Sequence, residues 1–100
     1  MYVIKRTKNF EQSLERLRRG GIKQSVIDKI EHTLDLLISG HKLPDSYRDH
    51  NLLGPHLGYR ECHIMGDLLL IYRIEADSLI LVLLDNRKII ARRLSVGLSC

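Results

Sequence analysis

The sequence predicts a single α+β domain in which an N-terminal strand and an αα-hairpin precede an antiparallel β-meander, in the order β-α-α-β-β-β. Apolar residues repeat with helical spacing in the first 40 positions. Three apolar runs of strand length then follow one another between residues 58 and 85, separated by short turn signals. The 100 residues, 44% of them hydrophobic, suffice for one core. We therefore expect one domain over residues 1–100, with the helices packed against one sheet.

The first strand and helix are predicted at residues 1–6 and 8–19. The opening MYVIKR alternates in polarity, which favours a short strand, and Thr7 is a suitable helix cap. The helix carries apolar residues at i, i+4 and i+7, namely Phe10, Leu14 and Leu17. Basic residues followed by Gly20 and Gly21 are typical of its C-terminal end.

A second helix is predicted within residues 22–40, and it ends at Gly40. Its apolar stripe consists of Val26, Ile30, Leu34, Leu37 and Ile38. Because only a short glycine turn separates the two helices, they are expected to form an αα-hairpin.

The second half of the chain predicts a meander of strands at 58–65, 67–74 and 78–85, after a segment 41–58 rich in turn residues. The second and third runs are apolar on both faces, which is typical of central strands. One face would be covered by the helices and the other by a partner or by the C-terminal segment. Residues 87–94, RKIIARRL, are compatible with a fourth strand or with a basic tail.

Composition restricts the classes of function. The net charge of +4 and pI near 9.3 suit an anionic partner without requiring one. The two cysteines, Cys62 and Cys100, lack framework spacing, and no signal peptide is recognised, so a cytoplasmic protein is expected. The apolar runs are shorter than the roughly 20 residues that span a bilayer, so no membrane association is expected.

Chemistry-bearing residues concentrate in YRECHIMGD, residues 59–67. In a strand, Glu61 and His63 share one face and Arg60 lies on the other. Asp67 begins the next strand after a tight turn, and His50 lies in a loop that returns to the sheet. Two imidazoles and a carboxylate are therefore expected to converge.

Such a group can cleave RNA through its own 2′-OH, which requires a base, an acid and cations for the phosphate. His50, His63, Asp67 and Arg60 match these needs by type, although ordinary surface histidines would show the same spacing. A metal site is not expected, because Cys62 and His63 point to opposite faces and no C-x-x-C or H-E-x-x-H motif is present. No cofactor is predicted.

Three stretches, KRTKNFEQSLERL, LPDSYRDHNLLG and GYRECHIMGDLLLIYRI, resemble the YafQ branch of the RelE/ParE toxin superfamily of prokaryotic type II toxin–antitoxin modules. The resemblance implies a microbial-RNase-like RelE fold and ribosome-dependent cleavage of mRNA without a metal. It also implies a cognate antitoxin of the RelB/DinJ kind, through which alone the toxin would contact promoter DNA.

The family's catalytic positions fall on His50, His63 and Asp67. The family then closes with a further catalytic histidine and a phenylalanine, whereas residues 85–100 of this chain diverge and contain neither. Asn86, Arg87 and Lys88 stand near the position of the missing histidine. Arginine and lysine can stabilise a phosphate but do not readily exchange protons at neutral pH. We therefore expect Arg60, Arg87 and Lys88 to bind RNA phosphate.

The sequence thus indicates a ribosome-dependent mRNA endoribonuclease. His50 and His63 share acid and base catalysis, and Asp67 orients the reacting groups or helps to protonate them. In this reading the divergent end supplies electrostatics through Arg87 or Lys88 while the two histidines transfer protons. The alternatives are that the divergent end cripples the toxin, or that the fold acts by binding alone. Two rival functions stay open: a non-enzymatic ParE-like inhibitor of DNA gyrase, and an inactive remnant that only binds its antitoxin.

Overall fold

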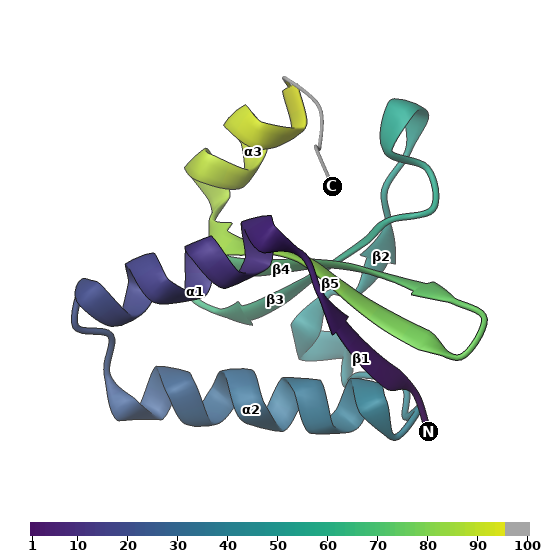
Figure 1. The fold of residues 1–100 in the computed structure, drawn as a ribbon, viewed down its shortest axis with the longest axis horizontal. Coiled ribbons are helices and arrows are strands. Elements are labelled where there is room, and N and C mark those ends of the chain that lie inside the picture. The colour runs from purple at the N-terminus through teal and green to yellow at the C-terminus, as the bar shows by residue number, and fades with distance from the viewer. Residues whose placement is uncertain (96–100) are drawn as a thin grey trace.

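The computed structural model describes residues 1–95, which form one five-stranded sheet with helices on both sides (Figure 1). The strands are β1 (Val3–Arg6), β2 (His50–Asn51), β3 (Arg60–Met65), β4 (Leu68–Glu75) and β5 (Ser78–Asn86). The helices are α1 (Lys8–Arg19), α2 (Gln24–Ile38) and α3 (Arg87–Ser95), with 3₁₀ turns η1 (Asp45–Tyr47) and η2 (Gly54–His56). The predicted α+β class is confirmed; Cys100 lies outside the described residues.

The strands lie in the order β1-β5-β4-β3-β2. β3, β4 and β5 form the predicted antiparallel meander, and β1 pairs with β5 in parallel. Helix α1 begins at the predicted Thr7 cap, whose hydroxyl oxygen accepts the N–H of Phe10 at 3.1 Å. The same hydroxyl donates to the carbonyl of Val82 at 2.8 Å, so the cap also attaches α1 to the sheet.

Two hydrophobic cores lie on opposite faces of the sheet. The larger core is formed with α1 and α2 and includes Phe10, Ile30, Leu37, Cys62, Leu70 and Leu84. The smaller core consists of Leu69, Ile71, Val82, Leu83 and Ile90, the last of these from α3. Because β4 and β5 are apolar on both faces, each face requires a cover, and α3 supplies the second one.

The expectation that residues 87–94 form a strand or a basic tail is therefore wrong. Helix α3 begins after Asn86, whose side-chain oxygen accepts the N–H of Ile89 at 3.0 Å. Ile90 is only 1% exposed, and Leu94, one turn later, packs against the same core. An asparagine cap followed by apolar residues at i and i+4 favours a helix over a strand, and this signal is present in the sequence.

The turn-rich segment 41–58 also contains a short edge strand. In β2, His50 pairs with Glu61 and Asn51 pairs with Arg60 in antiparallel register. The predicted meander thus gains a further antiparallel strand of two residues, and His50 belongs to the sheet rather than to a free loop. Among residues 1–95, no helix has the length and apolarity needed to cross a bilayer.

Burial of Ile90 is expected to be essential for the second core. Ile90→Ala should lower the free energy of unfolding by about 2–5 kcal/mol, because it leaves a cavity between α3 and the sheet. The matched control is Ile74→Ala, which makes the same deletion at a side chain that is 42% exposed, and it should cost less than about 1 kcal/mol. Urea denaturation measures both, and equal costs would contradict the role of α3 as a cover.

Candidate active site

The two histidines of the predicted site lie on the same face of the sheet. His63 pairs with Leu69, and Glu61 pairs with Ile71, both of which belong to the α3-side core. His50 is the register partner of Glu61 and is therefore a diagonal neighbour of His63. Diagonal neighbours of this kind lie about 7–8 Å apart. The two imidazoles thus belong to neighbouring positions on one face of the sheet.

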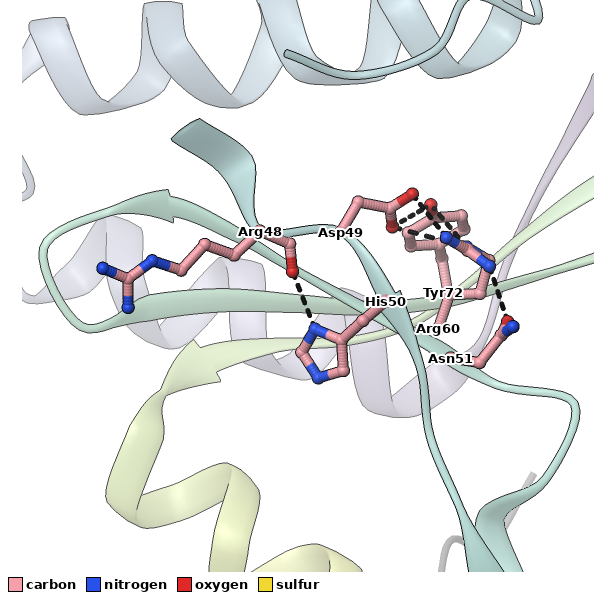
Figure 2. Close-up of polar contacts among 6 residues, drawn as sticks. All are labelled: Arg48, Asp49, His50, Asn51, Arg60 and Tyr72. Atoms are coloured by element: carbon pink, nitrogen blue, oxygen red, sulfur yellow. Dashed lines mark hydrogen bonds and ion pairs between the residues drawn. The ribbon is translucent and has the colours of Figure 1, made fainter. Parts of the chain in front are cut away.

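His50 is oriented by one contact on each ring nitrogen. Its Nδ1 lies 2.7 Å from the carbonyl oxygen of Arg48 and its Nε2 lies 3.5 Å from Oε1 of Glu61 (Figure 2 shows the first contact). A carbonyl can only accept, so Nδ1 carries a proton. The Glu61 side chain is 14% exposed, whereas that of His50 is 50% exposed. Each ring nitrogen of His50 therefore faces an oxygen acceptor, and half of the side chain remains exposed to solvent.

His63 lines an open hollow of about 290 Å³ between β3 and the start of α3. The hollow also includes Ser46, Arg48, Ile64, Met65, Gly66 and Arg87. Partial burial lowers the pKa of His63 below its ordinary value, and the positive charges of Arg87 and Arg48 lower it further, against the opposing effect of Glu61. His63 is accordingly neutral at neutral pH, with a ring nitrogen able to accept a proton.

Arg87 is brought to this hollow by the turn that contains Asp67. The backbone N–H of Arg87 donates to the carbonyl of Asp67 at 2.9 Å, which joins the start of α3 to the β3–β4 turn. The Asp67 residue is itself exposed. Lys88 is also exposed and does not line the hollow. Of the two C-terminal cations predicted from the sequence, the structure thus places Arg87 beside His63.

Arg60 does not join the histidines. Its guanidinium lies on the α2 side of β3, where Nη2 is 2.7 Å from Oδ2 of Asp49 and Nη1 donates to Asn51 at 2.5 Å (Figure 2). Its Nε contacts the hydroxyl of Tyr72 at 3.3 Å. The hydrogen bond to Asp49 raises the pKa of Arg60 above its ordinary value, against a smaller effect of burial. Each of the three guanidinium nitrogens thus has an acceptor within the protein.

The contacts made by several of these residues were not predicted from the sequence. Arg48 precedes the D-H pair and lines the hollow, while Glu61 proves to be the partner of His50 across the β2–β3 pair. Asp49 and Tyr72 bind Arg60. The available signal was alternation: once His50 is placed in a strand, its neighbour Asp49 must point to the opposite face, where Arg60 lies.

Comparison with known proteins identifies the family. The model of the family described as the bacterial toxin of type II toxin–antitoxin system, YafQ, matches residues 2–89. The chain therefore belongs to this family of bacterial toxins.

Two relatives and two solved structures illustrate the similarity. A Haemophilus influenzae protein described as a YafQ toxin is 37% identical over 67 residues, and the mRNA interferase toxin YafQ of Escherichia coli is 39% identical over 49 residues. The matches cover 67% and 48% of this chain, and they span only 66% and 53% of those relatives' own lengths.

Among solved structures, a metal-bound toxin from Helicobacter pylori is 32% identical with a TM-score of 0.74, covering 88% of this chain and 97% of that one. The E. coli DinJ–YafQ complex matches with a TM-score of 0.79 at 23% identity, covering 89% and 97%, which shows the shared fold. Within residues 1–95 of this chain, no group of three or more His, Cys, Asp or Glu side chains is placed to hold a metal ion.

The electrostatic origin of the His63 pKa can be tested directly. Arg87→Gln should raise the pKa of His63, because it removes the larger of the two cationic contributions, and Arg48→Gln should raise it by less. The control Arg19→Gln changes an exposed arginine of α1 that pairs with Glu15 and should have no effect. An NMR pH titration of the His63 ring protons measures the shift, and an unchanged midpoint in both site variants would refute the electrostatic account.

Proposed function

We propose that this YafQ-family chain is a ribosome-dependent mRNA endoribonuclease that cleaves RNA through its 2′-OH without a metal. The observation that carries the proposal is the diagonal placement of His50 and His63 on one face, with their ring nitrogens held in different environments. The His50 ring has an acceptor facing each of its nitrogens, whereas partial burial and two nearby cations lower the pKa of His63. An acid–base pair requires this difference.

His63 acts as the base. It takes the proton of the 2′-OH, and the 2′-oxygen attacks the adjacent phosphorus. His50 acts as the acid and donates a proton to the 5′-oxygen as the P–O bond breaks. The products are a 2′,3′-cyclic phosphate and a 5′-OH end, so each histidine finishes in the protonation state in which the other began. Asp67 is proposed to orient or help protonate the leaving group.

Cations stabilise the charge that develops on the phosphate. Arg87 is the principal candidate, because it lines the same hollow as His63, and Arg48 lies there too. Within the described residues, neither guanidinium forms a salt bridge with a carboxylate. Both remain available to an anion. Lys88 is exposed and would contact more distant backbone phosphates.

The proposed partners are mRNA on the ribosome and a cognate antitoxin of the RelB/DinJ kind that covers this surface. The E. coli YafQ structure in complex with DinJ supports the antitoxin, and the net charge of +4 suits both RNA and an acidic antitoxin. Promoter DNA would be contacted only through the antitoxin. Because the target is the translating ribosome, the proposed location is the cytoplasm.

Removal of either histidine should abolish most of the cleavage. In a purified translation system, His50→Ala and His63→Ala should each slow mRNA cleavage by about 10²–10⁴-fold, the usual cost of losing a proton-transfer group. His32→Ala, at an exposed position of α2, is the matched control. Wild-type rates in both site variants would refute the assignment. If the wild-type chain cuts no mRNA but blocks supercoiling by gyrase, the ParE-like function is correct instead.

The divergent C-terminal segment provides a second test. Related toxins carry a histidine near the position of Arg87, so Arg87→His should raise the cleavage rate by about tenfold or more, because it adds a proton-transfer group beside His63. Lys88→His is the control at the neighbouring exposed position and should have little effect. A lower rate in Arg87→His would show that the permanent charge of Arg87 is what the reaction requires.

A further inference from the structure

We infer that Arg60 is a positioning residue which, together with Tyr72, fixes Asp49 and thereby sets the position of the adjacent His50. The inference rests on the proposed function for its catalytic consequence, but its structural content can be measured without catalysis. It assigns to Arg60 a role different from the phosphate contact expected from its charge.

Four side chains are joined by hydrogen bonds beside strands β2, β3 and β4, namely those of Asp49, Asn51, Arg60 and Tyr72. Besides its 2.7 Å contact with Nη2 of Arg60, Asp49 accepts the hydroxyl of Tyr72 at 2.5 Å and lies 3.4 Å from Nε of Arg60. The Asp49 side chain is 20% exposed and that of Arg60 30%. Tyr72 is 1% exposed, and burial together with the bond to Asp49 raises its pKa, so its hydroxyl remains a donor. Asn51 completes the network.

His50 depends on this network because little else holds it. It belongs to a two-residue edge strand, its side chain is half exposed, and among residues 1–95 the polar partners of its ring are the Arg48 carbonyl and Glu61. Arg48 has a positive φ of 49°, a conformation that a non-glycine residue keeps only where its surroundings enforce it. Asp49 lies between the two, so its anchored carboxylate holds both the Arg48 carbonyl and the His50 backbone in place (Figure 2).

Direct binding of the scissile phosphate by Arg60 conflicts with the same geometry. Arg60 is in register with Tyr72 on the α2 side of the sheet, whereas His63 faces the α3 side. In both hollows that Arg60 lines, its guanidinium is paired with the carboxylate of Asp49, which lies 2.7 Å from Nη2. Arg60 can therefore affect a phosphate held between the histidines only through the backbone.

A double-mutant cycle distinguishes the two roles. Arg60→Lys keeps the charge but loses the planar fork, and Tyr72→Phe removes a single hydroxyl. Each should lower the single-turnover cleavage rate on ribosomes by about 10- to 100-fold with little change in KM, because His50 is displaced from the leaving oxygen. In a His50→Ala background, neither should cause a further loss. Arg73→Lys, at a neighbouring arginine of β4 that pairs with Glu75, is the matched control and should retain the wild-type rate.

Two results would overturn the inference. If the effects of Arg60→Lys and His50→Ala multiply, or if Arg60→Lys raises KM alone, Arg60 acts on RNA independently of His50. If Tyr72→Phe, which preserves the packing of the ring, leaves the rate unchanged, the network does not position His50. Circular dichroism establishes whether each variant is folded. If Arg60→Lys does not fold, the rate of Tyr72→Phe decides between the two roles.

NMR of the histidine rings gives a readout that needs no cleavage. In Tyr72→Phe, the His50 ring resonances should shift and its Nδ1 proton should lose protection from exchange, while His63 remains unchanged. An unperturbed His50 refutes the positioning role whether or not the toxin cuts RNA. A perturbed His50 in a chain that cuts no mRNA would preserve the positioning role and refute the proposed function.

Discussion

The apolar character of β4 and β5 on both faces is the constraint on which the whole architecture depends. Leu70 and Leu84 face α1 and α2, and Ile71 and Leu83 face the opposite side, so the sheet is stable only between two covers. The second cover, α3, begins where β5 ends. Its first residue, Arg87, is therefore delivered to the end of β3, beside a histidine. The positive charge of Arg87 beside His63 is therefore a direct result of covering the second face of the sheet with α3.

Strand alternation separates the charges of the site into two environments. On the α3 side, Arg48 and Arg87 surround His63, and within residues 1–95 neither has a carboxylate partner. On the α2 side, Arg60 is neutralised by Asp49. These arginines thus differ in their partners, because Arg60 is paired with a carboxylate whereas Arg48 and Arg87 are exposed to solvent. The number of basic residues in the sequence carries no information about this difference.

The spacing of apolar residues predicts those helices and strands that bury one face or one stripe of side chains. The helix at 8–19, the αα-hairpin and the three-stranded meander follow from it, as does the shared face of Glu61 and His63. Helix α3 was not predicted, because a short basic and apolar segment fits several structures unless the Asn86 cap is recognised. The Asp49–Arg60–Tyr72 contacts join residues 11 to 23 positions apart, and no repeat in the sequence encodes such pairings.

The parallel pairing of β1 with β5 has a consequence for biosynthesis. Strand β1 pairs with Ser78–Leu81, and the Thr7 hydroxyl donates to a carbonyl 75 positions later. Contacts of such long sequence separation form late in folding. A nascent chain therefore cannot pair β1 with β5, or place Arg87 beside His63, until residues 78–87 have been translated. A chain that ends before residue 87 therefore lacks the surface that Arg87 and His63 form together.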